Sequence, residues 1–392
     1  MLSTGFTVLI NFCYASRNHI RRQRHPQAPR SRGDFAIAII CALRKECDAV
    51  IAAFDQDWNE ISFGLPPGDD NTYSFGSIGQ HHVVLVHLPN IGKGIAAGAA
   101  AHCHTSFTEI KLCLVVGICG GVPTNAESED EPIVLGDVVI SKGVVQYDLG
   151  RQYSDGFRRK DTLNDNLPQL NYRLQGLLSK LEGLQARVKL QKAIASHLKS
   201  LAGEGALGDS ALYPRSPKVD KLFHASYRHM HGDVAMCDIC PRYPSSVDPV
   251  CEKALEESCD SLGCDEGKVI RRVQIKEPTT LVEHGRDSTS INVVRQPGHP
   301  FVHFGLYASG DKVMKSGEER DNIARTEKVI AFEMEGAGVW RQFQGHCLVI
   351  KGICDYADSH KSKEFQKYAA AAAAACMKAF LASWPDNGVI AN

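Results

Sequence analysis

Short apolar runs alternate with helix-like stretches along most of this chain. The runs with strand character are Phe35–Leu43, Val83–Leu88, Leu112–Cys119, Ile133–Ser141, Phe304–Ser309, Val329–Met334 and Cys347–Cys354. The stretches with helix character are Lys45–Phe54, Ile95–Phe107, a short one from Gly336, and Phe365–Ser383. Runs that are apolar throughout are typical of strands buried on both faces, with helices packed on each side. The pattern therefore predicts an α/β domain with a central mixed or mainly parallel sheet.

The alternation stops between about residues 165 and 300. This region begins with polar helical sequence and continues with a stretch rich in Gly, Pro, Cys and His, so we expect a large insertion in a domain that spans residues 34–383. Residues 1–33 carry six arginines and no acidic residue, which fits a disordered tail, a misassigned start codon or a mitochondrial presequence. Residues 384–392 are expected to be a tail.

The charge balance narrows the range of partners. Lys and Arg number 44 and Asp and Glu number 45, giving a net charge of -1 in 392 residues. This balance gives no indication of a nucleic-acid groove or a membrane-binding surface. No apolar run approaches the roughly 20 residues that a membrane-spanning helix needs. Many of the 14 cysteines lie inside apolar runs, as free thiols do in a reducing compartment, so a cytoplasmic location is expected, with a mitochondrial one as the alternative.

Acidic residues follow several of the apolar runs. Glu46 stands near the start of a predicted helix, where it could simply favour the helix dipole. Glu333 and Glu335 would project to one face of a strand, and Asp355 ends the last run, where it could also cap a turn. Carboxylates buried at neighbouring strand ends cost desolvation energy, so their presence favours a ligand site there.

Two further groups of residues have candidate roles. The glycine loop Gly117-Ile118-Cys119-Gly120-Gly121 follows a predicted buried strand and would let backbone amides approach a ligand or a phosphate. Its spacing, with Val122-Pro123 after it, differs from the dinucleotide-binding pattern. Five cysteines and three histidines of the insertion invite a zinc interpretation: Cys237, Cys240, Cys251, Cys259, Cys264, His224, His229 and His231. Only Cys237 and Cys240 have the spacing of structural zinc ligands, so free or packed thiols are favoured over a structural zinc site, and no catalytic metal is expected.

Six motifs occur together in the order typical of the nucleoside phosphorylase/nucleosidase superfamily, and the chain resembles its methylthioadenosine/S-adenosylhomocysteine nucleosidases. These motifs are Ile40–Glu46, Asn90–Lys93, Gly117–Gly121, Ser309–Asp311, Phe332–Ala337 and Cys354–Asp358. The segments Ala225–His229, Cys259–Asp265 and Val313–Gly317 resemble the fungal branch, whose domains often front ankyrin-repeat or NACHT-type receptor proteins. The resemblance implies a three-layer α/β/α nucleoside phosphorylase-like fold.

The resemblance also implies roles for individual residues. Asp355 matches the general acid that protonates a purine base, Glu335 the residue that holds the ribose hydroxyls, and Glu46 the carboxylate that activates water. A pKa above the usual range would let Asp355 donate a proton near neutral pH, so a raised pKa is expected for this carboxyl. The other substrate-binding positions that the resemblance implies are Glu333, Met334, Gly120, Gly121, Ser309, Asp311, Met314 and Lys351.

Water and phosphate remain the two candidate nucleophiles. Arg44 and Gly117 are the candidate phosphate ligands, but Val115 stands where family phosphorylases carry an arginine. Retention of Glu46 and loss of that arginine favour hydrolysis. A phosphorylase that uses inorganic phosphate and a non-catalytic nucleoside sensor are the alternatives. Three positions depart from the nucleosidase pattern: Ile118, Val313 and Lys351.

The expected partner is a small-molecule purine nucleoside, without an organic cofactor, nucleic acid or membrane. Family members are homo-oligomers, so at least a dimer is expected.

Overall fold

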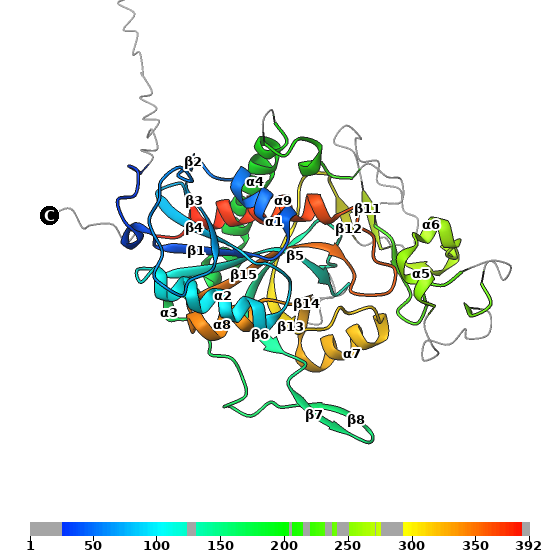
Figure 1. Cartoon of the computed structure of the whole chain (residues 1–392). Helices are drawn as coiled ribbons and strands as arrows, with labels where there is room; N and C mark the ends of the chain where they lie inside the picture. The colour runs from blue at the N-terminus through cyan, green and yellow to red at the C-terminus, as the bar shows by residue number, and fades with distance from the viewer. Residues whose placement is uncertain are drawn as a thin grey trace, which may run out of the picture.

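A mixed sheet forms the centre of the molecule. The structure is a computed structural model that describes residues 26–123, 131–203, 206–214, 220–231, 237–240, 251–270, 272–275 and 293–385. Nine of the described strands form one sheet in the order β14-β13-β6-β15-β5-β1-β4-β3-β2 (Figure 1). Their bounds are β1 Ile37–Cys41, β2 Gln56–Asp57, β3 Thr72–Ile78, β4 His81–His87, β5 Leu112–Gly121, β6 Val138–Gln146, β13 Val302–Ser309, β14 Val329–Glu333 and β15 Cys347–Asp355.

The pairing directions confirm the mixed character of the sheet. β1 runs parallel to β4 and β5, β15 runs parallel to β5, and β13 runs parallel to β6 and β14. The pairs β15–β6, β3–β4 and β2–β3 are antiparallel. Each of the seven predicted apolar runs overlaps one of the sheet strands, and β2 and β3 are strands that the sequence pattern did not reveal.

One end of the sheet closes on itself. β14 pairs with its neighbour β13 and also, antiparallel, with β5, where Ala331 lies opposite Gly121 and Phe332 opposite Gly120. β15 meets the same end of β5, with Asp355 opposite Gly120. The ends of three strands therefore converge on the glycine loop.

Helices cover both faces of the sheet and give the predicted three layers. α1 (Arg44–Ala52), α4 (Leu184–Leu201) and α9 (Gln366–Leu381) pack on one face, and α2 (Lys93–Ser106) and α8 (Gly336–Phe343) pack on the other (Figure 1). α7 (Gly317–Glu327) lies beside β14. The small side chains of α9 allow close approach to the sheet: a Cβ at Gly352 of β15 would lie 2.1 Å from the carbonyl oxygen of Ala369.

The helical start of the expected insertion belongs to the main core. α3 (Tyr172–Glu182) packs on α4, and α4 buries Leu190, Ile194 and Leu198 in the same hydrophobic cluster as the sheet. A separate small cluster appears only later, around Phe223. The expected boundary near residue 165 therefore does not mark a change of core, because the apolar face of α4 fits the α1–α9 layer.

The part of the insertion with its own core lies to one side of the sheet (Figure 1). Its described elements are β9 Leu222–Phe223, α5 Glu252–Glu256, α6 Cys259–Leu262 and β10 Val269–Ile270, with the short strands β11 Val273–Ile275 and β12 Val293–Arg295 following. The hairpin of β7 (Gly150–Tyr153) and β8 (Gly156–Arg159) projects from another side.

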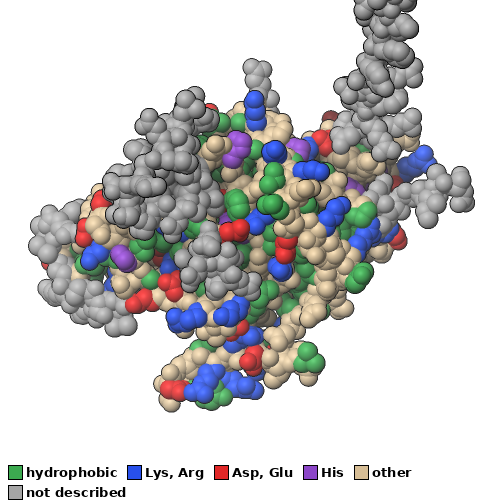
Figure 2. All heavy atoms as spheres, turned by 180° about the vertical axis from the view of Figure 1, so that it is seen from behind, with side chains coloured by type: hydrophobic (Ala, Val, Ile, Leu, Met, Phe, Trp, Pro, Cys, Tyr) green, Lys and Arg blue, Asp and Glu red, His purple; other side chains and the backbone are tan. Residues whose placement is uncertain are grey.

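The expected tails fall largely outside the described residues, which begin at 26 and end at 385. Trp384 is buried against the core, so the folded part reaches just beyond residue 383. Within the described residues, no helix combines the length and the apolar character needed to cross a membrane. Acidic and basic side chains are interspersed over the face seen in Figure 2, as the balanced composition predicts.

Candidate functional site

A cavity of about 240 Å³ lies where β5, β14 and β15 end and α1 begins. Glu46, Glu335 and Asp355 all line it. The other lining side chains include apolar ones from β5, β14 and the segment before α7, among them Ile118, Phe332, Val313, Met314 and Met334. The site thus combines an apolar wall with three converging carboxyl groups, as small-molecule sites commonly do.

Glu46 is fixed in place by three backbone amides. Its Oε2 accepts hydrogen bonds from Ala42 N at 3.0 Å and Leu43 N at 2.8 Å, and its Oε1 accepts one from Ile118 N at 2.7 Å. Burial raises the pKa of Glu46 to about 7, while the nearby Lys351 ammonium opposes this rise. Glu46 therefore both caps the start of α1 and presents to the cavity a carboxyl that can exchange a proton near neutral pH.

Gly117 makes room for this carboxyl. A Cβ at Gly117 would lie 2.0 Å from Glu46 Oε1, far inside van der Waals contact. The glycine loop therefore receives the Glu46 side chain, and the Ile118 amide is already used by it. This differs from the expected phosphate-binding role of Gly117, because a second anion there would meet both the carboxylate and a donor that is already engaged.

Glu335 forms a buried charge cluster with Lys351 and Glu333. Lys351 Nζ lies 2.5 Å from Glu335 Oε2 and 3.3 Å from Glu333 Oε2. Burial favours the neutral form of Lys351, but Glu335, Glu333 and Glu46 outweigh it and hold the pKa of Lys351 well above its usual range. Lys351 is therefore a charged partner that offsets part of the negative charge of the glutamates.

Glu333 and Ser309 hold the backbone around Glu335. Glu333 Oε2 accepts the amides of Glu335 at 2.9 Å and Gly336 at 2.8 Å, and Ser309 Oγ accepts the Ala337 amide at 3.0 Å. These contacts satisfy free amides at the start of α8. Glu333 lines the cavity, whereas Ser309 is not among the lining residues and holds the start of α8, so its contact with substrate stays a prediction.

Asp355 is paired with a lysine that the sequence analysis did not identify. Its Oδ1 accepts hydrogen bonds from Lys361 Nζ and from Ala357 N, both at 2.8 Å. Burial pushes the pKa of Asp355 up, but Lys361 and the hydrogen bonds outweigh it, and the pKa is lowered. The expectation of a raised pKa at Asp355 is therefore wrong for the chain without ligand, because the expectation left out Lys361.

The remaining candidate residues divide between the cavity and its surroundings. Gly120, Met314 and Met334 line the cavity. Gly121 packs against Ile353, where a Cβ would lie 2.9 Å from its Cγ2. Asp311 lies outside the lining and accepts the Lys93 amide at 2.8 Å.

Arg44 points away from the site. Its side chain is 94% exposed, and its nearest acidic partner is Asp48 on the same helix, at 3.9 Å. Arg44 sits at the start of α1, two residues before Glu46, so the helix turns it toward solvent while Glu46 faces the sheet. Its expected role as a phosphate ligand has no support from this position.

Lys361, Lys312 and Gln366 are lining residues that the sequence reasoning missed. Lys361 and Gln366 lie in the loop after β15 and at the start of α9, and Lys312 lies just after Asp311. Single polar residues in or beside loops give no periodic signal, so only proximity to the Cys354–Asp358 and Ser309–Asp311 motifs could have identified them.

Comparison with known proteins identifies the family. Residues 36–201 and 226–382 match the phosphorylase superfamily, and the chain belongs to this superfamily. It is also 32% identical over 354 residues to a nucleotide-binding leucine-rich repeat (NLR)-like protein of Hyaloscypha variabilis. The match covers 89% of this chain but only 29% of that protein. This relative agrees with the resemblance to domains found in receptor proteins.

Solved structures with a similar fold include three nucleoside-cleaving proteins. One is the futalosine hydrolase of Helicobacter pylori, with a TM-score of 0.48, 15% identity, and coverage of 89% of this chain and 98% of that one. The second is the 5'-methylthioadenosine/S-adenosylhomocysteine nucleosidase of Neisseria meningitidis in complex with methylthio-immucillin-A. Its TM-score is 0.48 and its identity 16%, and the match covers 88% of this chain and 97% of that one. The third is the Streptococcus pneumoniae MTA/SAH nucleosidase in complex with 8-aminoadenine. Its TM-score is 0.48 and its identity 18%, and the match covers 88% of this chain and 99% of that one. Similarity of this degree does not bear on the substrate of this chain.

Proposed function

We propose that the chain hydrolyses the N-glycosidic bond of a purine nucleoside. The observation that carries the proposal is the position of Glu46, whose carboxyl is fixed by three amides, has a pKa of about 7 and faces the same cavity as Glu335 and Asp355. A base of this pKa is suited to taking a proton from water near neutral pH.

In the proposed reaction the bond between the anomeric carbon and the purine nitrogen breaks as positive charge develops on the sugar. Water adds to the anomeric carbon and gives a proton to Glu46. Glu335 accepts hydrogen bonds from ribose hydroxyls, and these strengthen as the sugar becomes cationic. The purine leaves with the electron pair of the broken bond and takes up a proton at the Asp355 end of the cavity.

Proton delivery to the base is assigned to Asp355 and Lys361 as a pair. Because the Asp355 carboxyl is held ionised by Lys361 in the chain without ligand, the proton has to reach the purine through this pair rather than from a neutral Asp355. Lys361 Nζ donates a hydrogen bond to Asp355 Oδ1 at 2.8 Å, so in this proposal Lys361 is the member of the pair that carries the proton.

Water is favoured over phosphate by the charges at the glycine loop. Glu46 already occupies the Ile118 amide, Lys351 is paired with two glutamates, and no arginine lines the cavity within the part of the chain that the structure describes. A phosphate dianion beside Glu46 would be repelled rather than held.

The test is a screen of purine nucleosides with different 5′ groups for release of free base, by chromatography, with and without added phosphate. Hydrolysis yields the free sugar at a rate independent of phosphate. Formation of a sugar 1-phosphate with a phosphate-dependent rate would establish the phosphorylase instead. Calorimetric binding of a nucleoside without release of base would establish a sensor.

The same preparation tests the proposed self-association. Light scattering at micromolar concentration is expected to give a mass of at least two chains, and a mass of one chain contradicts it.

A further inference from the structure

The cysteine- and histidine-rich part of the insertion brings eight potential metal ligands into two groups of four. The first, the His231 cluster, consists of His231, Cys237, Cys240 and Cys251. The second, the His360 cluster, consists of His229, Cys259, Cys264 and His360. In each cluster the ligand atoms all lie within 4.8 Å of one another.

The spacing of these atoms matches a tetrahedral metal site. Zinc bonds of about 2.3 Å to sulfur and 2.0 Å to nitrogen place neighbouring ligands roughly 3.3–3.8 Å apart. In the His231 cluster, His231 Nδ1 lies 3.3 Å from Cys240 Sγ and 3.9 Å from Cys251 Sγ. In the His360 cluster, His360 Nδ1 lies 3.7 Å from Cys259 Sγ and 3.9 Å from Cys264 Sγ.

The backbone of the His231 cluster supports thiolates. The amides of Ile239 and Cys240 point at Cys237 Sγ, at 3.3 and 3.4 Å. Such amide contacts favour the charged sulfur that binds zinc. Cys237 Sγ and Cys251 Sγ are 3.7 Å apart, well beyond the roughly 2.05 Å of a disulfide bond.

The His360 cluster contains a buried histidine with unsatisfied nitrogens. His229 is buried, with 4% of its surface exposed. Neither nitrogen of its ring has a hydrogen-bond partner among the described residues. A buried imidazole without partners is costly, and a metal ion would satisfy it.

The ring of His360 is oriented so that Nδ1 faces the two cysteine sulfurs of its cluster. Its Nε2 lies 3.0 Å from the carbonyl oxygen of Tyr227, which can only accept, so Nε2 carries the proton and Nδ1 is free to bind. This is the outer contact that metal-binding histidines usually make. The ring is also stacked on Phe223, with centroids 4.0 Å apart.

The described part of the insertion has a small hydrophobic core. Among its described residues, the cluster buries six: Phe223, Cys240, Cys251, Ala254, Leu262 and Cys264. Units this small usually need a metal or disulfides to fold, and five of the eight candidate ligands are also among these buried residues or packed against them.

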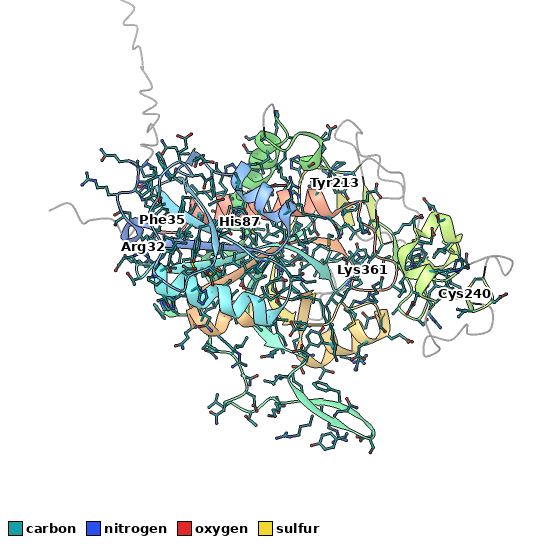
Figure 3. All side chains as sticks on the ribbon, in the orientation of Figure 1. Arg32, Phe35, His87, Tyr213, Cys240 and Lys361 are labelled. Carbon is teal, nitrogen blue, oxygen red and sulfur yellow. The ribbon has the colours of Figure 1, made fainter. Side chains whose placement is uncertain are left out.

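We propose that each cluster binds one Zn²⁺ and that the second ion fastens the insertion to the main domain. Closed sets of four cysteine and histidine ligands are typical of structural zinc. Three ligands of the His360 cluster come from the insertion, while His360 follows β15 by five residues and precedes Lys361. Figure 3 shows Lys361 between the sheet and the insertion, with Cys240 farther out in the insertion. The ion at the His360 cluster therefore holds the loop that presents Lys361 to Asp355.

Metal content of the full chain tests this proposal without any assay of nucleoside cleavage. Protein purified without chelators is expected to contain two zinc ions per chain by elemental mass spectrometry. Cys251→Ser and Cys259→Ser are each expected to lose one ion, and the control Cys376→Ala, a buried cysteine of α9, to keep both. Less than half an ion per chain in the wild type, or an intact mass reduced by the hydrogens of disulfide bridges, overturns the proposal.

Cobalt substitution of the wild type covers the case in which a variant fails to fold. Two tetrahedral cobalt sites with sulfur-to-metal charge-transfer absorption are expected, and an octahedral spectrum without it contradicts both sites.

The fastening role is tested by hydrogen exchange in residues 355–363. Cys259→Ser and His360→Ala should speed exchange there by at least tenfold, His360→Cys should restore both metal and protection, and Cys251→Ser should leave this segment unchanged. Equal exchange in all four variants rules out the fastening role.

Discussion

The cavity and the insertion differ in how they hold their buried polar groups. In the cavity, Lys351 lies among Glu333, Glu335 and Glu46, on strands and a helix that are fixed by a continuous apolar core. In the insertion, cysteine and histidine side chains gather around two points with only a small apolar cluster beside them. The first region can keep costly charges because the fold holds them in place. The second region depends on its polar groups for its shape.

The contrast is tested most strongly by Glu46→Gln. We expect release of base to fall at least about 100-fold, because the amide cannot take a proton from water. The melting temperature should fall slightly, because glutamine keeps one accepting oxygen while its NH2 faces a backbone N–H that the second carboxylate oxygen accepts. The exposed Glu60→Gln is the matched control. Activity in Glu46→Gln equal to that of the control would remove Glu46 from the mechanism.

Removal of Lys351 should damage the whole fold. Lys351→Met leaves Glu333 and Glu335 buried without their cation, which costs about 3–5 kcal/mol of unfolding free energy. The control Lys142→Met breaks a half-exposed pair with Glu182 and should cost under about 1 kcal/mol. Denaturant titration measures both.

The same titration distinguishes the two regions. Cys251→Ser should leave the main transition in place and add an early one from the insertion. A main transition that shifts as far in Cys251→Ser as in Lys351→Met would show that the regions fold as one unit.

Gly117→Ala should disturb the cavity without removing a functional group. The added Cβ would lie 2.0 Å from Glu46 Oε1, so the carboxyl has to move, and we expect about a tenfold loss of kcat or more. Gly98→Ala is the matched change in α2, where a Cβ meets nothing within 4 Å, and it should stabilise the chain by about 0.5–1 kcal/mol. Steady-state kinetics and thermal melting of both variants decide the point.

The smallest expected effect is the pH dependence set by Glu46. With a pKa of about 7, the ionised fraction grows about tenfold between pH 6 and pH 8, so kcat/KM should rise through this range.

The contribution of Glu46 to folding stability changes with pH in the opposite direction to kcat/KM. The folded-state pKa of Glu46 is raised above the unfolded value of 4.5, so protonation favours the folded state. Its contribution to stability is present below pH 4.5 and is lost as the pH rises to about 7.

A kcat/KM that is flat from pH 6 to 8 would contradict the role of Glu46 as base.

The fold was predictable to the extent that strands are apolar on both faces. β1, β5 and β15 are continuous apolar runs, and each was expected within a few residues. β3 was missed because Thr72–Ile78 mixes polar and aromatic residues with a glycine, which is the pattern of a strand near the edge of a sheet.

The site was predictable where chemistry lies in a short motif. Glu46, Glu335 and Asp355 were expected together and line one cavity, although their roles stay proposals. Lys361 and His360 were not found. Their partners are six and about a hundred residues away along the chain, and such contacts leave no spacing pattern.

The second pairing of β14 has a consequence for association. Strands at the end of an open sheet offer free amides and carbonyls to other chains. Since β14 turns back onto β5, that end is already occupied by its own chain, and the opposite end of the sheet is the two-residue β2. Copies of this protein that join one another should therefore do so through helices or the projecting hairpin, and addition of a strand to the sheet is disfavoured at both of its ends.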